Sequence, residues 1–400
     1  MRVKRAAAFR EGSEAVAQRA RADVIALTLA KHAPIFAVLC LPPAIWGAFE
    51  EQWAFAAALV APTLAAAAVF AATWSRELPD DLRGIEALLS VAIVFGLSAL
   101  LLVPAFMTLG MRPLDALFEA MSGATTTGLS VAAAPDTWPF AGHVLRAWVQ
   151  WCGGLVIATA VLALLLPSGL PARKLGQAGI DQGDRIASTR RQAQQLLGVY
   201  LGLTVIMAIV TAMAIPDWRE GVVLTLAAIS TAGFSPRADS LASYSWIGQG
   251  LVILTCVLGA VSLLTYVLIL QGRLREARNL GSARRVLVAL GLFCALYVAL
   301  TAADGMREPG AYYESLLNLI SGLTTSGFST GPMPAPGALL LIVIVAMIVG
   351  GDVGSTAGVL KLARIGIMSD AFRHAFHRPR LPARAVAPLR HDGEPVSDRT

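Results

Sequence analysis

The chain has 400 residues, of which 56% are hydrophobic and only 14% are charged, and its mean hydropathy is +0.65. This composition excludes an ordinary soluble globular protein and is typical of a chain that crosses a lipid bilayer many times. The net charge of +6 does not indicate a nucleic-acid partner, because the arginines and lysines gather in short segments between long apolar runs.

Eight apolar runs are long enough to cross about 30 Å of hydrocarbon, which takes roughly 20 helical residues. They cover residues 24–49, 54–74, 85–109, 143–166, 194–215, 245–271, 285–302 and 338–367. With an even number of crossings the basic clusters fall on one side, which places both termini in the cytoplasm. The sequence therefore predicts an all-α polytopic membrane protein with about eight transmembrane helices.

The runs are organised as a leading pair followed by three similar units. Residues 1–84 contain an N-terminal cytosolic segment and a two-helix hairpin, and residues 373–400 form a cytosolic tail or linker. The units between them cover residues 85–170, 171–272 and 273–372, the last two including a basic linker. Each unit has a span, a short amphipathic segment, a polar loop and a second span.

The short segments, residues 112–123, 219–228 and 309–320, cannot cross a bilayer. We expect each to be a re-entrant half-helix that enters the membrane and turns back. An irregular polar loop at membrane depth is tolerated only where protein buries it or water reaches it. Three such loops predict a common water-filled axis.

Each half-helix leads into a loop of small residues that ends in a glycine, and the glycines are roughly one hundred residues apart. The loop residues are Thr126, Thr127, Gly128, Thr231, Ala232, Gly233, Thr325, Ser326 and Gly327. Glycine frees the backbone, and nearby carbonyl and hydroxyl oxygens can replace the water shell of an ion. The C-terminal end of a half-helix favours a cation. Small residues also let membrane helices pack closely, but three loops in matching context favour a cation pathway.

Glycines and small hydroxyl residues interrupt the last run halfway along. Gly350 lies about 18 Å down a helix from residue 338, and the residues that follow are poor helix formers. We therefore predict an unwound segment in the middle of the membrane, between two halves of one span.

Three stretches resemble the Trk/Ktr/HKT superfamily of potassium transporters. DALFEAMSGATTTG, residues 115–128, is similar to the first pore helix and filter of the family. Arg146 with QWCGG, residues 150–154, resembles the start of the following helix, and GGDVGSTAGVLKLAR, residues 350–364, is the most specific match. The resemblance implies potassium uptake through a glycine-lined selectivity filter, with K⁺ as the substrate ion and no covalently bound cofactor.

The resemblance also implies an intramembrane gating loop below the filter. Its residues would be Gly350, Gly351, Asp352, Gly354, Ser355, Thr356, Gly358, Lys361 and Arg364. Lys361 and Arg364 either face the pore as a barrier to cations or reach to the cytoplasmic interface. Related proteins imply a homodimer in the cell inner membrane, docked on a cytosolic nucleotide-binding regulatory ring.

The sequence departs from the family pattern at several positions. Asp352 stands where a small neutral residue is usual and needs a partner, for which Lys361 and water are candidates. Val359 replaces a glycine and predicts a shorter or stiffer gating loop. Arg237 follows the second filter loop, and we expect Asp239 or Asp136 to neutralise it.

A filter of this kind is lined by four loops, and we find three. We therefore expect either a truncated or split form that cannot transport alone, or a further chain that supplies the fourth repeat. An intramembrane protease is the alternative of another class. Its serine form needs a histidine base within the membrane and its aspartyl form a second carboxylate beside Asp352, and the sequence offers neither. We therefore expect no enzymatic activity.

Overall fold

A computed structural model describes residues 20–77, 84–165, 185–303, 309–335, 337–377, 390–391 and 394–395. The predictions for the N-terminal cytosolic segment, for most of the first basic linker and for most of the tail concern residues outside these ranges. The described part is helical, apart from one antiparallel pair of two-residue strands, β1 (Arg390–His391) and β2 (Glu394–Pro395). The all-α class is therefore confirmed.

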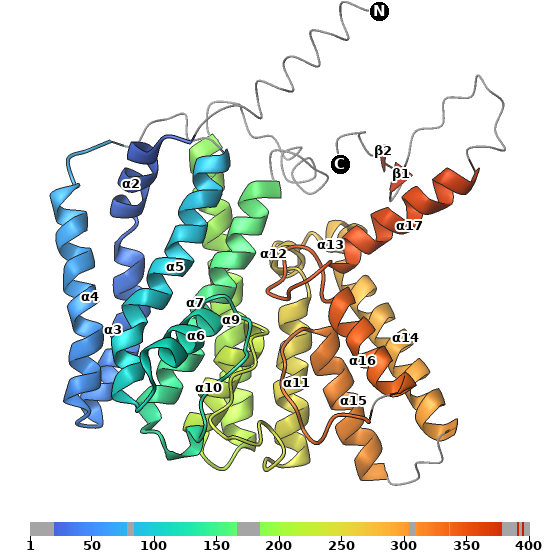
Figure 1. Cartoon of the computed structure of the whole chain (residues 1–400). Coiled ribbons are helices and arrows are strands. Elements are labelled where there is room, and N and C mark those ends of the chain that lie inside the picture. Colours follow the sequence, from blue (N-terminus) through green and yellow to red (C-terminus); the bar gives the residue numbers. More distant parts are fainter. Residues whose placement is uncertain are drawn as a thin grey trace, which may run out of the picture.

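The leading hairpin contains three helices. α2 (Ala22–Lys31) and α3 (Pro34–Phe49) form one bent rod, because Pro34 begins α3 directly after a turn at His32 and Ala33. α4 (Trp53–Ala72) returns beside α3, and the pair lies at one edge of the molecule (Figure 1).

The helices that follow can be grouped by the three predicted units (Figure 1). The first unit has α5 (Gly84–Thr108), α6 (Pro113–Ala124), the 3-10 turn η1 (Pro135–Thr137) and α7 (Phe140–Leu165). The second unit has α9 (Arg185–Ala214), α10 (Trp218–Ile229), α11 (Trp246–Ala260) and α12 (Leu263–Leu270). After a connecting helix, α13 (Leu274–Leu280), the third unit has α14 (Ser282–Ala303), α15 (Pro309–Leu323), α16 (Ala338–Val349) and α17 (Leu362–His377). A short helix therefore stands where each half-helix was predicted.

Local sequence explains where the short helices begin. Pro113 lies in the first turn of α6, where its missing N–H costs nothing. The Asp217 side chain caps α10 by accepting a hydrogen bond from the amide of Arg219.

Each short helix packs against the first long helix of its own unit. α10 also packs on α7, and α15 on α11, so consecutive units meet through a short helix and the second long helix of the unit before.

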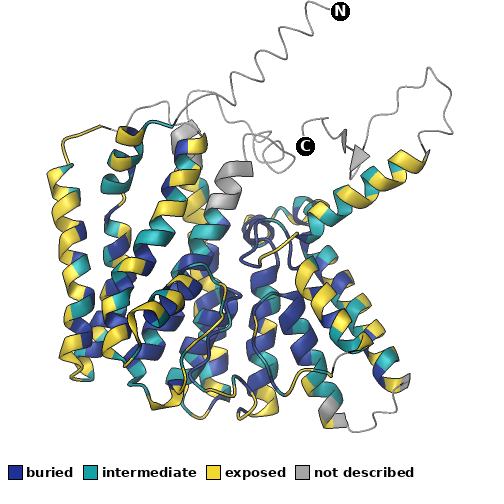
Figure 2. Cartoon of the chain, viewed as in Figure 1, coloured by how far each residue is buried: buried dark blue, intermediate teal, exposed yellow. Residues whose placement is uncertain are grey.

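The outer faces of the helices carry many exposed residues (Figure 2), and many of these are large and apolar. Leu64 of α4, Ile206 of α9 and Leu292 of α14 are 64%, 59% and 65% exposed. A contiguous apolar exterior of this kind is stable in lipid and not in water. Within the described residues, five helices are long and apolar enough to cross a membrane, or six if α11 and α12 count as one bent span. The chain is thus a multi-pass membrane protein, and eight crossings remains a prediction.

The predicted span of residues 245–271 is not one straight helix. It bends by 85° between α11 and α12, at Val261 and Ser262. The backbone groups freed by the bend find partners elsewhere, because the Ala260 carbonyl accepts from the Asp352 amide at 3.0 Å and the Leu263 amide donates to the Gly354 carbonyl at 2.9 Å. The run predicted to cross the membrane is therefore a bent pair of helices, and whether it crosses as one span stays a prediction.

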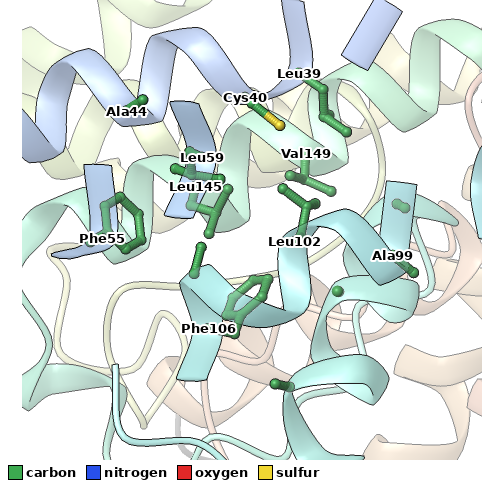
Figure 3. Packing of buried hydrophobic residues seen from close by; sticks show 14 of the residues in the cluster. Leu39, Cys40, Ala44, Phe55, Leu59, Ala99, Leu102, Phe106, Leu145 and Val149 are labelled. Atoms are coloured by element: carbon green, nitrogen blue, oxygen red, sulfur yellow. The ribbon is translucent and has the colours of Figure 1, made fainter. Parts of the chain in front are cut away.

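The largest buried apolar cluster joins the hairpin to the first unit (Figure 3). Phe55 and Leu59 of α4 meet Leu102 and Phe106 of α5 and Leu145 of α7 in this cluster, and all five are at most 1% exposed. Burial of each such side chain contributes about 1.5–3 kcal/mol by transfer from water. The contribution is smaller for transfer from lipid, where close packing stabilises the contact instead. The hairpin is thereby fixed against α7, which carries residues of the site.

Candidate functional site

The three predicted filter loops share one backbone conformation. We call residues 125–128 loop 1, residues 230–233 loop 2 and residues 324–327 loop 3. In each loop a threonine adopts a left-handed conformation and a glycine does so two residues later; the φ angles are 57° and 78° for Thr126 and Gly128, 51° and 87° for Thr231 and Gly233, and 57° and 78° for Thr325 and Gly327. Such angles are uncommon for threonine, so three matching pairs show that the same local backbone is repeated in the three loops.

The hydrogen bonds that close the short helices also match. The residue before each glycine donates its amide to a carbonyl five residues earlier, from Thr127 to Ser122 at 2.9 Å, from Ala232 to Ala227 at 2.9 Å and from Ser326 to Ser321 at 3.0 Å. These bonds satisfy one carbonyl at each helix end and hold the loop directly over it. The negative end of each helix dipole therefore lies beside its loop.

The loops lie next to one another in chain order. A Cβ atom added to Gly128 would stand 1.8 Å from the carbonyl oxygen of Ala232 in loop 2, and one added to Gly233 would stand 1.9 Å from the carbonyl oxygen of Ser326 in loop 3. Only glycine allows these approaches. Among the described residues, no atom lies within 4 Å of the same position on Gly327.

Two half-helices hold the loop that follows them through a side chain nine residues before the glycine. Glu119 accepts from the amide of Val131 at 3.0 Å, and Asn318 accepts from the amide of Thr330 at 2.7 Å. Both side chains are buried, at 0% and 3% exposure. The position in α10 is Leu224, which has no polar group.

The last run is interrupted where the sequence predicts. We call residues 350–361 the gate segment; α16 ends at Val349 before it, and α17 begins at Leu362 after it. The segment lies against two loops, because the Gly358 amide donates to the Thr325 hydroxyl at 2.8 Å and the Thr356 hydroxyl is 3.3 Å from that of Thr231. Thr356 also donates to the Ile229 carbonyl at 2.9 Å.

Asp352 has a partner that the sequence analysis missed. Its carboxylate accepts from Arg285 of α14 at 2.8 Å and from the amide of Ala363 at 3.1 Å, so it also caps the start of α17. Lys361, one of the two expected partners, instead donates from Nζ to the Ser355 carbonyl at 3.2 Å. The sequence did not indicate Arg285 as a partner of Asp352, because this arginine lies in a basic cluster of the kind that marks the cytoplasmic side of membrane proteins.

Two residues of the gate segment have strained backbones. Val359 and Lys361 have φ angles of 68° and 69°, in the left-handed region that a β-branched residue such as valine rarely enters. The family glycine that Val359 replaces would adopt this conformation without cost. Lys361 is buried and Arg364 is exposed, so the two cations have different surroundings.

The chain that follows loops 1 and 2 leads to a polar pocket of about 680 Å³ beside the start of α10, and we call this end of the bundle the loop end. Arg237 lies in its wall and pairs with Glu220 at 3.0 Å, not with Asp239 or Asp136, so the expected partners were wrong. Asp136 accepts from the amide of Ala238. A second pair joins Asp217 and Arg219 at 2.8 Å, and this hydrogen bond holds the pKa of the Asp217 carboxyl below its usual value.

An intramembrane serine protease would need a serine nucleophile such as Ser326 or Ser355, and both hydroxyls have other partners. The Ser326 hydroxyl lies 3.1 Å from the hydroxyls of Ser321 and Thr324, and the Ser355 hydroxyl donates to the Asp352 carbonyl at 2.6 Å. Both serines are buried within backbone and hydroxyl networks that hold the loops.

Comparison with known sequences gives the family. The TrkH family model, described as a cation transport protein, matches residues 54–400. The Trk system potassium uptake protein TrkH of Halomonas elongata is 30% identical over 287 residues, which is 69% of this chain and 58% of that protein. The Trk system potassium uptake protein TrkG of Escherichia coli is 26% identical over 299 residues, or 72% of this chain and 60% of that protein. The chain therefore spans somewhat more than half the length of these relatives.

A solved structure has the same fold. The crystal structure of the potassium transporter TrkH from Vibrio parahaemolyticus superposes with a TM-score of 0.78 over 93% of this chain and 79% of that chain, at 21% sequence identity. The family is one of transport proteins and not of enzymes. Because its model covers most of the sequence, the chain belongs to the TrkH family of cation transport proteins.

Proposed function

We propose that the chain forms part of a potassium uptake pathway in the cell inner membrane. The observation that carries the proposal is the set of three neighbouring loops with matching φ angles, two of which contact the gate segment. Relatives named as potassium uptake proteins support K⁺ as the ion. Loss of K⁺ flux is therefore the expected result of any change that separates the loops.

The loops have the chemistry of a cation filter. Their carbonyl oxygens and threonine hydroxyls can replace the water shell of a singly charged cation. Coordination of such an ion does not need a carboxylate. The three helix dipoles end beside them and add a negative potential. We assign this role to the residues predicted from the sequence: Thr126, Thr127, Gly128, Thr231, Ala232, Gly233, Thr325, Ser326 and Gly327.

The gate segment would block the pathway below the filter in the conformation described. Its hydrogen bonds to Thr325, Thr231 and the α11–α12 bend hold it there, and Arg285 fixes Asp352 at its base. Opening would exchange these bonds for others, and the glycines at 350, 351, 354 and 358 permit the backbone to move. Lys361, buried within the segment, would add a positive barrier while the gate is closed.

Gly327 supports the proposal that a fourth loop is required. Gly128 and Gly233 each touch the next loop in the series, whereas the face of Gly327 contacts nothing among the described residues. A fourth hydroxyl-glycine loop, on a segment outside the described residues or on another chain, would close the ring between loops 3 and 1. The alternative is that the chain is a fragment without transport activity of its own. A homodimer and a cytosolic nucleotide-binding ring stay proposals from the family.

Potassium uptake by a host that lacks its own uptake systems tests the proposal. Cells expressing the chain should grow at low K⁺ if the pathway is complete, or grow only when a segment supplying the fourth loop is co-expressed. A Gly233→Asp variant, which would place a carboxylate against the Ser326 carbonyl, is the negative control. Failure of growth in both settings, with the protein present in the membrane, would reject potassium uptake.

A further inference from the structure

Loop 2 lacks the support that the other two loops receive from their own half-helices. Glu119 and Asn318 hold the backbone three residues beyond the glycines of loops 1 and 3. At the corresponding places the second unit has Leu224, which cannot accept a hydrogen bond, and Pro236, which has no amide to donate. Something else must fix loop 2.

Two side chains of α7 hold loop 2 from the neighbouring unit. Arg146 and Gln150 stand one helical turn apart and are 3% and 0% exposed. Gln150 donates from Nε2 to the Ala232 carbonyl at 3.0 Å and accepts from the Phe234 amide at 3.2 Å, so it binds the backbone on both sides of Gly233.

Arg146 links the same loop to the first unit. Its Nη1 donates to the Ser235 carbonyl at 2.9 Å, its Nη2 donates to the Ser130 hydroxyl at 3.0 Å, and its guanidinium lies 4.1 Å from the ring centroid of Phe234. Its Nε forms an ion pair with Glu119 at 3.0 Å, without the geometry of a hydrogen bond. One buried cation thus connects α6, the chain after loop 1 and the chain after loop 2.

The carbonyl that Gln150 holds is also the one that loop 1 approaches. The Ala232 oxygen lies 1.8 Å from the position of a Cβ on Gly128, so its direction sets the spacing between loops 1 and 2. Selectivity among cations of one charge depends on the number and placement of coordinating oxygens. A side chain that fixes this carbonyl therefore acts on selectivity without touching the ion.

We propose that Gln150 and Arg146 are positioning residues that fix loop 2 against loop 1 and thereby determine the preference of the filter for K⁺ over Na⁺. The proposal rests on the proposed potassium pathway. Gln150 sets the carbonyl direction, and Arg146 with Glu119 holds the two chains beyond the glycines at a fixed separation.

The test compares Gln150→Met with Gln249→Met in liposomes, together with any segment the host assay shows to be needed. Gln249 is 5% exposed and also donates to backbone carbonyls, but those belong to residues 241, 242 and 244, which are not part of loops 1 to 3. We expect Gln150→Met to lower the K⁺/Na⁺ flux ratio by about tenfold, a change of roughly 1.4 kcal/mol, and Gln249→Met to leave it unchanged. An unchanged ratio in folded Gln150→Met protein would overturn the proposal.

A second variant and a hydrogen-exchange measurement distinguish failure of the positioning role from misfolding of the variant and from failure of the proposed function. Gln150→Glu keeps an acceptor for the Phe234 amide but cannot donate to Ala232 when ionised, and it serves if the Met variant does not fold. Hydrogen exchange of the peptide containing Phe234 should quicken in Gln150→Met, which loses the acceptor for the Phe234 amide, and not in Gln249→Met. If the wild-type protein passes neither ion, the proposed function fails; unchanged exchange at Phe234 would then reject the positioning role on its own.

Discussion

Asp352 carries a charge in the interior of a membrane protein, where an unpaired carboxylate is costly. Its side chain is 1% exposed and that of Arg285 is 21% exposed, so the pair joins the gate segment to α14 in a partly water-excluded setting. A buried charge left without its partner destabilises a protein by about 3–5 kcal/mol, and partial exposure of Arg285 reduces that figure here. The pair is therefore strong enough to hold the gate segment against α14.

We predict that Asp352→Asn raises K⁺ flux. Asparagine keeps an oxygen for the Ala363 amide but loses the charge that attracts Arg285, which weakens only the link to α14. A loss of about 1 kcal/mol from the closed state corresponds to roughly fivefold more flux. K⁺ flux into liposomes measures the effect of Asp352→Asn. The matched control is Glu276→Gln, which breaks a surface ion pair with Arg273. Equal flux in wild type and Asp352→Asn would show that the pair does not hold the gate.

Val359 offers a test of strain in the same segment. We predict that Val359→Gly raises the melting temperature in detergent, because a valine at a φ of 68° costs about 1–3 kcal/mol that glycine avoids. The side chain is 56% exposed, so little packing is lost. Val353→Gly is the control, since Val353 has no left-handed backbone and should only lose stability. A lower melting temperature for both variants would mean that Val359 is not strained.

At the scale of single elements, the three loop glycines form a controlled series. Their φ angles of 78°, 87° and 78° give alanine a similar backbone cost at each position, so differences must come from the neighbours. We predict that Gly128→Ala and Gly233→Ala lower the melting temperature of the chain more than Gly327→Ala does, because only the first two place Cβ within 2 Å of a carbonyl oxygen. Equal losses at all three would indicate that another segment already contacts Gly327.

The elements themselves were largely predictable from the sequence. Short helices form at Pro113–Ala124, Trp218–Ile229 and Pro309–Leu323. They were predictable because each run is too short to cross a bilayer and ends in small hydroxyl residues and a glycine. The break at Gly350 was predictable for the same local reason. The left-handed backbone of Thr126, Thr231 and Thr325 was not predictable, because threonine rarely adopts that conformation and nothing in the sequence marks it.

Features that depend on contacts between distant segments escaped prediction. No proline marks the bend after Ala260; it forms because the gate segment supplies partners for the freed backbone groups. The pairing of Arg285 with Asp352 joins residues 67 positions apart, and that of Arg237 with Glu220 crosses the length of α10. Charge and proximity in sequence suggested other partners, and only the packed helices bring these together.

At the scale of the whole molecule, the two ends of the bundle differ in charge. The pocket lies at the loop end, where Arg219 and Arg237 are each paired with a carboxylate. The opposite end carries α13 and α17, with arginines at 273, 275, 278 and 373 (Figure 1). Short basic segments stay in the cytoplasm when a membrane protein inserts. We therefore predict that the loop end faces outward.

Labelling with a membrane-impermeant thiol reagent checks this orientation. Ala238 lies at the loop end and Ser369 on α17, and both are exposed. In a background with Cys40, Cys152, Cys256 and Cys294 replaced, we expect Ala238→Cys to react in intact cells and Ser369→Cys to react only after permeabilisation. The cysteine-free background controls for other reactive groups. The reverse pattern would place the filter on the cytoplasmic side of the gate segment, and ions entering the cell would then meet the gate before the filter.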